Sequence, residues 1–527
     1  MALTWPPGLP TSLDYPDVPV GALLAGSARR FGDRIAFRRG DDELSFAELW
    51  RRSCRFAHAL ADRDIGVGSP VALRMSNCLA YPVAYYGLHL AGAVFVPVNP
   101  LLPEREAAAL MADAGTVLTL TEADVPAMCA VGSAAGSDVA PPVDIDPGRD
   151  LAHLAYTGGT TGRSKGVRLT HRNVVVNTVQ HGCWHHGALP ALDGDGPPVG
   201  VVLDQVGSPR EWPTRLGTGI FINLMPWFHA MGTIAGMNVP LLAGMTTVLH
   251  DRFDPVAYLA DAERFRVTYL AGAPALYAGL LACPDIRTRD LSSVRAIGSG
   301  GAPMPVDMIE ALRELMPDAV ICEGYGLTEV TMGATNPPAN ASGLAKPGSV
   351  GVPMFDTEIR IVPADGGLDP LPAGESGEIC VHGPQVMSGY HNNPAATAEV
   401  LTGGWLRTGD IGVLDTDGYL SIVDRKKDML IYKGYNVYPR ELEALLTAES
   451  GIAAAAVVGR PDHDVGELPV AFVVPKSGHQ LDADELMAAV NDQVAPHQKL
   501  RELRFVARLP ISAAGKILKR ELRDQLG

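Results

Sequence analysis

The stretch Tyr156-Thr157-Gly158-Gly159-Thr160-Thr161-Gly162-Arg163-Ser164-Lys165-Gly166 follows the apolar run from Leu151 to Tyr156. Glycines let the backbone turn tightly and approach a ligand closely. Consecutive backbone N–H groups in such a turn form a concave anion site, and the threonine hydroxyls and Lys165 add donors and positive charge. The pattern is not a Walker A loop, because Gly166 rather than Ser or Thr follows Lys165. It predicts a polyphosphate-binding loop, the alternative being a flexible polar loop without a ligand.

The composition indicates a globular protein of two or more domains. The chain has 527 residues, 47% hydrophobic and 19% charged, with a net charge of −16. This acidic balance argues against a nucleic-acid partner, which requires a basic footprint. The seven cysteines are dispersed without a CxxC pair, which fits a reducing compartment. No secretory signal and no apolar run of roughly 18 residues is present. We therefore expect a cytoplasmic protein; contact with a membrane surface and a homodimer stay open.

The first half of the chain predicts an α/β fold with parallel strands. Short apolar runs alternate with segments of helical apolar spacing, as parallel βαβ units require. The expected strands are 71–75, 93–98, 116–120, 221–225, 294–297 and 320–322, and the expected helices are 47–61, 81–91, 104–114 and 173–180.

The segment from Gly182 to Gly219 carries prolines at 190, 197, 198, 209 and 213. Such length without a periodic pattern is unusual in a compact domain, so we interpret it as a lid-like excursion or a disordered surface loop. His181, His185 and His186 lie at its start, with Cys183 between them. These residue types can bind a metal ion, but no second ligand cluster accompanies them, which leaves a structural role as the favoured reading.

Two further strand ends carry small-residue turns. The expected strand at 294–297 runs into Gly298-Ser299-Gly300-Gly301-Ala302-Pro303, and that at 320–322 runs into Glu323-Gly324-Tyr325-Gly326-Leu327-Thr328-Glu329. Open α/β sheets bind ligands at such strand ends. We therefore expect both turns to contribute to one ligand site.

The last third of the chain changes character. Short strands and Gly/Pro/Asp turns between 348 and 421 predict a β-rich subdomain. The charge run Asp424-Arg425-Lys426-Lys427-Asp428 is interpreted as a linker and hinge. Beyond it, Pro439 is placed to begin a helix, and Asp482 with Glu485 to begin another. The predicted division is an N-terminal domain, 1–423, and a small mobile C-terminal α/β domain, 424–527.

Together the motifs resemble the adenylate-forming superfamily, which comprises acyl-CoA synthetases, firefly-luciferase-like enzymes and the adenylation domains of peptide synthetases. The resemblance covers nearly the whole chain, is strongest to fatty-acyl-CoA ligases, and rests on seven motifs in the family's order. They are TGGTTGRSKG at 157–166, MPWFHAMG at 225–232, EGYGLTE at 323–329, RTGD at 407–410, DRKKD at 424–428, KGYNVYP at 433–439 and PISAAGKI at 510–517.

The resemblance implies roles for individual residues. Those assigned to ATP or AMP are Thr157, Gly158, Gly159, Thr160, Thr161, Lys165, Gly301, Ala302, Pro303, Glu323, Gly324, Tyr325, Gly326, Asp410 and Arg425. The acyl pocket is assigned to Trp227, His229, Gly300 and Gly326, the coenzyme A tunnel to Lys433 and Gly434, and the hinge to Asp424. The catalytic set is Lys516, Glu329, Thr328 and His229, with Glu329 as ligand of Mg²⁺.

The implied reaction is that of an AMP-forming acid–thiol ligase using ATP, Mg²⁺ and coenzyme A. A carboxylate attacks the α-phosphorus of ATP, so cations must lower the repulsion between two anions. Residues 230–236, Ala-Met-Gly-Thr-Ile-Ala-Gly, contain no acid to pair with a substrate amine, which favours a fatty or other apolar acid, with aryl acids still open. The alternatives are transfer to a separate acyl carrier protein, a non-catalytic nucleotide-binding homologue, and a luciferase-like oxygenase.

Overall fold

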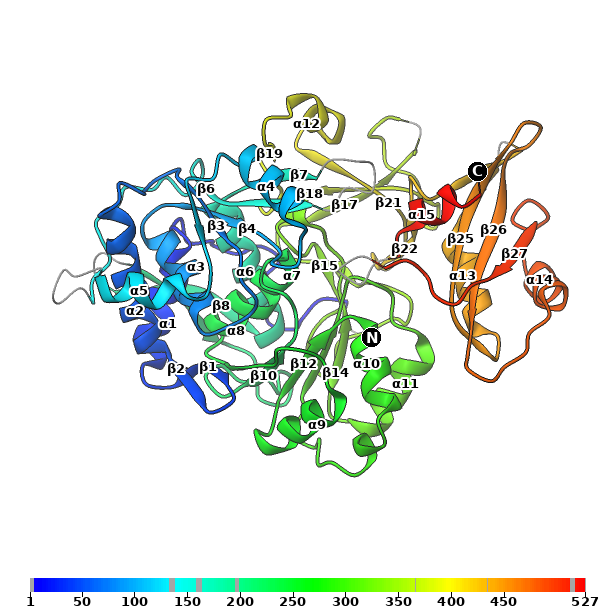
Figure 1. The fold of residues 1–527 in the computed structure, drawn as a ribbon. Coiled ribbons are helices and arrows are strands. Elements are labelled where there is room, and N and C mark those ends of the chain that lie inside the picture. Colours follow the sequence, from blue (N-terminus) through cyan, green and yellow to red (C-terminus); the bar gives the residue numbers. More distant parts are fainter. Residues whose placement is uncertain are drawn as a thin grey trace.

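The computed structural model describes residues 4–131, 138–157, 164–194, 199–364, 366–433, 435–511 and 517–526. Two mixed sheets with helices form the large part of the molecule (Figure 1). The first has seven strands, parallel except at β2. Its order is β14 (Val320–Glu323), β13 (Ala296–Ser299), β12 (Tyr269–Gly272), β10 (Ile220–Asn223), β11 (Thr246–Leu249), β1 (Ile35–Arg39) and β2 (Asp42–Ser45).

The second sheet has six strands and begins with the predicted βαβ unit. Strand β3 pairs in parallel with β4, with α3 (Ala80–Leu90) between them in the sequence. The order is β19 (Gly389–Tyr390), β7 (Lys165–Thr170), β6 (Leu151–Thr157), β4 (Val94–Pro97), β3 (Pro70–Leu73) and β5 (Leu118–Leu120). Every residue of β4 is buried, which explains why the sequence of this strand is apolar throughout.

Helices form in the large part at each of the four ranges where the apolar spacing predicted one. Besides α3, the helices of this part include α1 (Gly21–Phe31), α2 (Phe46–Ala61), α4 (Glu104–Asp113), α5 (Asp124–Val131), α6 (His171–His186), α7 (Ala230–Thr233), α8 (Val239–Leu242), α9 (Pro255–Arg264), α10 (Pro274–Ala282), α11 (Val306–Leu315) and α12 (Pro394–Val400). A π-helix, η1 (Ile234–Asn238), joins α7 to α8. Among the described residues, no helix has the length and apolar character needed to cross a membrane.

The interpretation of 182–219 as a lid or disordered loop is wrong for its described residues. They contain an antiparallel hairpin of β8 (Ala188–Asp193) and β9 (Gly200–Gln205). The hairpin packs on α1 so closely that a Cβ added to Gly26 would lie 2.0 Å from the carbonyl oxygen of Val201. This contact with a distant helix stabilises the hairpin, and no local pattern reveals it.

The predicted β-rich subdomain is a five-stranded antiparallel sheet. It consists of β17 (Glu358–Val362), β18 (Gly377–His382), β21 (Trp405–Leu414), β20 (Leu401–Thr402) and β22 (Leu420–Arg425). Nearby, the short strands β15 (Thr335–Asn336) and β16 (Val352–Pro353) pair with each other. Figure 1 shows this sheet between the large sheets and the C-terminal unit.

The C-terminal unit has its own sheet and its own buried core. Its strands are β24 (Tyr435–Val437), β23 (Leu430–Tyr432), β26 (Gly466–Pro475), β25 (Ile452–Asp462) and β27 (Glu502–Phe505), and its helices are α13 (Pro439–Ala448), α14 (Ala483–Asn491) and α15 (Lys519–Asp524). The helix starts predicted at Pro439 and Asp482 are confirmed: the proline lies in the first turn of α13, and Asp482 caps α14.

Candidate active site

Tyr325 and the RTGD motif meet through a direct hydrogen bond. The Tyr325 hydroxyl donates to Oδ2 of Asp410 over 2.7 Å. Asp410 also faces Arg425 across the β21–β22 ladder, with 3.6 Å between the Arg425 Nε and its Oδ1. Burial and the nearby carboxylate raise the pKa of Tyr325 well above its usual value, so its hydroxyl stays a donor. An aromatic ring, a carboxylate and a guanidinium are thus gathered at one position.

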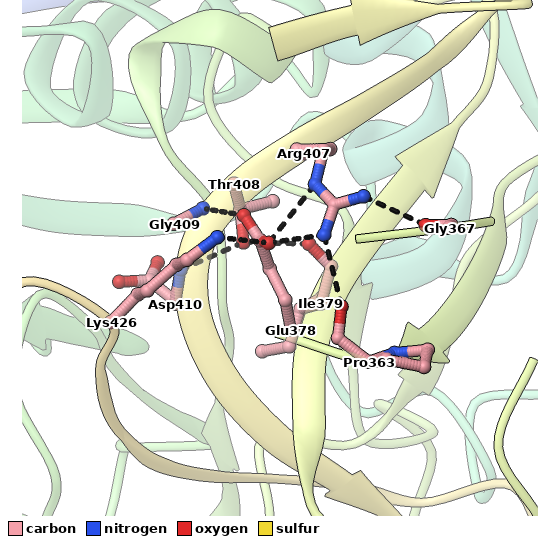
Figure 2. Close-up of polar contacts among 9 residues, drawn as sticks. All are labelled: Pro363, Gly367, Glu378, Ile379, Arg407, Thr408, Gly409, Asp410 and Lys426. Atoms are coloured by element: carbon pink, nitrogen blue, oxygen red, sulfur yellow. Dashed lines mark hydrogen bonds and ion pairs between the residues drawn. The ribbon is translucent and has the colours of Figure 1, made fainter. Parts of the chain in front are cut away.

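A buried glutamate, Glu378, holds the RTGD segment of β21 in place (Figure 2). Its Oε2 accepts from Arg407 Nη2 over 2.7 Å and from Lys426 Nζ over 3.1 Å. Its Oε1 accepts from the backbone N–H of Gly409 over 3.2 Å. The Glu378 side chain is only 4% exposed. The two cations therefore take the place of water in compensating the carboxylate charge. Through Gly409, Glu378 positions the neighbouring Asp410.

Glu329, the predicted magnesium ligand, is held by a strand of the second sheet. The hydroxyl of Tyr390 in β19 donates to Oε1 of Glu329 over 2.9 Å. The ammonium group of Lys165 lies 4.8 Å from the centre of the Tyr390 ring, in cation–π geometry. Tyr390 therefore connects the lysine of the Thr/Gly motif to the carboxylate of the EGYGLTE motif, two groups that the sequence separates widely.

The backbone around Glu329 is unusual. Thr328 begins a 3₁₀ turn, η3 (Thr328–Val330), and Thr331 after it has a φ of 68°. A β-branched residue in the left-handed region is strained, and such residues cluster at functional sites. The Thr331 hydroxyl donates to the Gln385 carbonyl oxygen over 2.8 Å, which compensates part of the strain. The strained turn determines where Thr328 and Glu329 lie.

The two ends of the Thr/Gly motif are paired strands. Thr157 ends β6 and Lys165 begins β7, and the two residues are partners in the antiparallel ladder. Ser164 donates from Oγ to the Thr157 carbonyl oxygen over 2.5 Å. Gly158, Gly159, Thr160 and Thr161 lie outside the described residues, so their assignment as phosphate ligands stays a prediction. The described ends of the motif therefore lie side by side on two antiparallel strands of the second sheet.

The two strand-end turns lie side by side, as predicted. Ser299 and Glu323 are partners at the ends of the parallel strands β13 and β14, and the Gly324 N–H donates to the Ser299 carbonyl oxygen over 3.0 Å. Gly326 is required by packing, because an added Cβ would lie 1.8 Å from the carbonyl oxygen of Met332. Gly301, with a φ of 81°, needs a glycine for conformation. The turn from Gly300 through Ala302 and Pro303 therefore faces the turn of Glu323 to Gly326.

Glu323 is a perturbed carboxylate at the base of this turn. Burial raises its pKa to about 7, while the Met304 N–H at 3.3 Å and the charge of Arg440 oppose the shift. Near neutral pH the group therefore exists in both protonation states. A carboxyl group poised in this way is a feature of functional sites.

We expect Glu323→Gln to become stabilising relative to the natural chain as the pH rises. Because the pKa is raised from 4.5 to about 7, burial of Glu323 carries no penalty below pH 4.5, and the penalty grows until the pH exceeds 7. The gain of the variant should reach about 1–3 kcal/mol at pH 8.5 and be small at pH 5. Urea unfolding at both pH values measures it. The exposed Glu310→Gln serves as control, and a pH-independent difference for Glu323→Gln would contradict the expectation.

His229 and Trp227, from the MPWFHAMG motif, have different surroundings. His229 is exposed and caps α7, since its Nδ1 accepts from the Met231 N–H over 3.4 Å. Met231 in turn lies beside Gly300, with its sulfur 3.6 Å from an ideal Cβ there. The Trp227 side chain is instead fully buried against Phe37 and Tyr81 in the main core. Its described contacts are those of a core residue that anchors the motif, and they give its predicted role in the acyl pocket no support.

A cavity lies behind the motif; the space between its walls is about 580 Å³, including a part that is open to solvent. The wall consists of side chains from α6, η1, α8 and strands β12 to β14, together with neighbouring residues. They are His181, His185, His186, Thr214, Ala235, Val239, Pro240, Met245, Tyr269, Ala296, Ile297, Val320, Cys322 and Ala339. Except for the histidines, most of the wall is apolar, as expected for an apolar acid.

The metal alternative for His181, Cys183, His185 and His186 gains no support. Across the described ranges, no group of three or more His, Cys, Asp or Glu side chains is arranged to hold a metal ion. Burial also raises the pKa of the Cys183 thiol, which disfavours the thiolate that metals bind. A single carboxylate, Glu329, is by contrast compatible with Mg²⁺, which in proteins often takes one or two carboxylates and completes its shell with water and substrate phosphates.

The expected hinge residue joins the C-terminal unit to the β-rich sheet. Asp424 is 5% exposed; its Oδ2 accepts from the Arg440 N–H at the start of α13 over 2.9 Å, and its Oδ1 accepts from the Arg425 N–H over 2.7 Å. Lys433 has a φ of 50° and donates from its backbone N–H to Val465. Gly434 and Lys516 lie outside the described residues, so the tunnel and the catalytic lysine remain predictions.

We expect Tyr390→Phe to raise the Mg²⁺ concentration needed for half-maximal pyrophosphate release by about tenfold. The substitution removes the hydroxyl that orients Glu329 but keeps the ring beneath Lys165, and a hydrogen bond to a charged group contributes about 1.5–3 kcal/mol. Tyr419→Phe is the matched control, because Tyr419 also donates its hydroxyl, to Leu344 over 2.7 Å, and also lies beneath a lysine, Lys346. Equal Mg²⁺ requirements in both variants would contradict the expectation.

Known proteins resemble this chain along most of its length. The sequence model of the AMP-binding enzymes matches residues 24–391, and that of the AMP-binding enzyme C-terminal domain matches residues 441–516. Feruloyl-CoA synthase of Amycolatopsis sp is 38% identical over 522 residues, covering 96% of this chain and 99% of that protein. Long-chain-fatty-acid–CoA ligase of Bacillus subtilis (strain 168) is 32% identical over 575 residues, covering 99% and 97%. ATP-bound MatB from Rhodopseudomonas palustris superposes with a TM-score of 0.81 at 29% identity, covering 96% and 98%.

Proposed function

This chain belongs to the family of AMP-binding enzymes and is an acid–CoA ligase, and from this premise we propose that it activates an amine-free carboxylic acid with an apolar body. In the proposed sequence the carboxylate and ATP form an acyl-adenylate and pyrophosphate, and coenzyme A then forms the acyl-CoA and releases AMP. An arylpropenoic acid is the first candidate, because the feruloyl-CoA synthase is 38% identical. A fatty acid is the second, from the relative at 32%.

The observation that carries the proposal is two sets of contacts, one from Lys165 to Glu329 and one from Tyr325 to Arg425. Lys165 lies over Tyr390, and Tyr390 donates to Glu329. Four residues before Glu329, Tyr325 donates to Asp410, which faces Arg425. A nucleoside triphosphate needs groups of these kinds in this order: a cation for the outer phosphates, an oxygen ligand for a metal ion, an aromatic ring for the base, and a carboxylate for the ribose hydroxyls.

We assign the steps to the residues accordingly. Lys165 and the backbone of the Thr/Gly motif bind the β- and γ-phosphates, and Thr328 contacts the α-phosphate. Glu329 would hold Mg²⁺, which neutralises charge on the phosphate oxygens when bound. Asp410 and Arg425 bind the ribose, so that the α-phosphorus is presented to the carboxylate. Lys516 bridges the carboxylate and the α-phosphate and stabilises the charge that develops there.

The test is release of AMP and pyrophosphate with a panel of carboxylic acids, with and without coenzyme A. The proposal expects pyrophosphate release that depends on the acid, and AMP release that depends on both the acid and coenzyme A. Amino acids should give no response, because residues 230–236 include no carboxylate to pair with the amine. Pyrophosphate release that no acid stimulates would overturn the proposal. AMP release that requires an acyl carrier protein and does not respond to coenzyme A would show that the carrier protein, not coenzyme A, is the acyl acceptor.

A further inference from the structure

Three buried hydrogen bonds follow one another through the core of the large part. The Tyr86 hydroxyl donates to Oδ1 of Asn238 over 2.7 Å, and Nδ2 of Asn238 donates to the Tyr85 hydroxyl over 2.9 Å. The Tyr85 hydroxyl in turn lies 2.9 Å from Nε2 of His153. Tyr85, Tyr86 and Asn238 are fully buried, and His153 is 4% exposed. This series of bonds connects η1 to β6 by way of α3.

The donors and acceptors of the series leave one arrangement of protons. The Tyr85 oxygen accepts from the amide of Asn238, and among the described residues His153 is its other polar partner. Burial, with the charge of His171 as a smaller cause, lowers the pKa of His153 to about 3. The ring is therefore neutral at physiological pH, and its Nε2 accepts the Tyr85 proton. Hydrogen bonds that all point in one direction strengthen one another.

Pro240 explains why the helix widens into a π-turn at η1. A proline has no N–H, and its ring clashes with the carbonyl group four residues before it, which here belongs to Gly236. In η1 the Val239 N–H donates to the carbonyl oxygen of Ile234, five residues back. The Gly236 carbonyl oxygen accepts instead from Nε1 of Trp227 over 3.1 Å. The sequence thus determines the π-turn, and the last residue of η1 is the one that bonds to α3.

Each end of the series lies beside a proposed binding site. Ala235 of η1 and Val239, which follows η1, line the cavity. At the other end, His153 belongs to β6, and this strand ends at Thr157, the ladder partner of Lys165. The register of the β6–β7 ladder shifts just before His153. Such irregularities recur at active sites, as π-turns do. The series therefore joins the wall of the cavity to the strand that pairs with the proposed phosphate contact.

The packing around the series leaves it little room to absorb a displacement. The Phe95 ring of β4 lies edge-on to the rings of Tyr85 and His153, with 5.1 Å between centres in each case. Close-packed interiors have low compressibility and transmit strain. A ligand that shifts or orders η1 should therefore shift or order β6 as well.

We propose that Tyr85 is a positioning residue that couples the two substrates of the first half-reaction. An acid in the cavity, acting through Asn238, Tyr85 and His153, raises the affinity for ATP, and ATP raises the affinity for the acid by the same factor. The inference rests on the proposed function, because it takes the cavity as the acid site and Lys165 as a phosphate contact. It adds a coupling that the assigned contacts alone do not require.

The experiment measures the dissociation constant of the acid with and without α,β-methylene-ATP and Mg²⁺ by isothermal titration calorimetry. The probe acid is ferulate or dodecanoate, whichever supports the faster release of pyrophosphate from ATP. The methylene analogue cannot release pyrophosphate, so binding is measured without reaction. In the natural chain we expect the analogue to lower the dissociation constant of the acid at least about fivefold. The acid should lower the dissociation constant of the analogue by the same factor.

Variants on one helix separate the coupling from packing. Tyr85→Phe keeps the ring and removes the hydroxyl, so the coupling factor should fall close to one. Tyr86→Phe is the matched control, because Tyr86 also donates to Asn238 but lies outside the path from Asn238 to His153; it should retain the coupling. Tyr81→Phe should retain it too, since the Tyr81 hydroxyl is buried without a partner among the described residues. His153→Phe breaks the path at its other end, and combining it with Tyr85→Phe should cause no further loss.

The outcomes distinguish the inference from the proposed function. An unchanged coupling factor in Tyr85→Phe, or no coupling in the natural chain, would overturn the inference while acid-dependent pyrophosphate release still supports the proposed function. Equal losses in Tyr85→Phe and Tyr86→Phe would assign the effect to the packing of α3 and would also overturn it. This comparison decides even where His153→Phe does not fold. Pyrophosphate release that no acid stimulates would overturn the proposed function, and the inference with it.

Discussion

Lys516→Ala should abolish formation of the acyl-adenylate while the transfer of the acyl group from supplied adenylate to coenzyme A continues. The reason is the charge balance of the first half-reaction, in which one anion attacks another. Removing a single group that stabilises developing charge lowers kcat by about 10²–10³-fold. The second half-reaction needs no such bridge, because AMP leaves from an activated acyl group. Pyrophosphate release measures the first half-reaction, and acyl-CoA formation from synthetic adenylate measures the second.

Lys519→Ala is the control for this variant. Lys519 is three residues away, and its ammonium group pairs with Glu443 at 2.7 Å, so its loss affects the C-terminal unit without removing the predicted catalytic charge. It should leave both half-reactions near their natural rates. If Lys516→Ala slowed both half-reactions to the same extent, the assignment of Lys516 to the first step alone would fail.

Glu378→Ala should reduce both stability and nucleotide affinity. Removal of this carboxylate leaves Arg407 and Lys426 without their shared partner, and breaking a buried ion pair from one side costs about 3–5 kcal/mol. The Gly409 N–H also loses its acceptor, so Asp410 is no longer held toward Tyr325. We expect a lower free energy of unfolding in urea together with a KM for ATP raised about tenfold or more.

A surface glutamate gives the comparison. Glu48 pairs with Arg52 at 2.7 Å on α2, with side-chain exposures of 29% and 47%, and such pairs contribute less than about 1 kcal/mol. Glu48→Ala should change the unfolding free energy by less than about 1 kcal/mol. It should leave the KM for ATP unchanged. Glu378→Gln keeps one acceptor oxygen, so its unfolding free energy and its KM for ATP should lie between those of the natural chain and of Glu378→Ala. An unchanged KM in Glu378→Ala would show that Asp410 does not depend on this carboxylate.

The sequence predicted most of the fold, because periodic apolar segments bounded by glycine-rich turns report local structure directly. The parallel strands β3, β4, β13 and β14 and the turns behind them lie where the pattern placed them. The β8–β9 hairpin did not follow from the pattern, since its stability comes from contact with α1, including the ion pair of Arg29 with Asp193 at 3.1 Å. Prolines in the segment also concealed the alternation of its strands.

The site was predicted less completely than the fold. The motifs singled out Tyr325, Asp410 and Glu329 as candidates, but did not point to Glu378 and Tyr390, the residues that contact or position them. Each of the two lies in a strand that is far in the sequence from the residue it positions. Taken alone, neither differs from an ordinary strand residue. One signal was available for Glu378, a charged residue in the otherwise apolar strand 377–381, which is buried along its length. A charge at such a position requires a partner.

The pairing of β21 with β22 has a thermodynamic consequence. Asp410 faces Arg425, and the adjacent Ile411 faces Asp424, so the proposed ribose contacts and the proposed hinge are neighbours on one ladder. If the C-terminal unit has two orientations with different affinities for nucleotide, then nucleotide binding shifts the equilibrium between them by the ratio of these affinities, and the equilibrium in turn sets the observed affinity. A substitution at Asp424, which accepts from the backbone N–H of Arg440, would then shift AMP affinity without touching AMP. The dissociation constant of AMP therefore reports the relative populations of the two orientations.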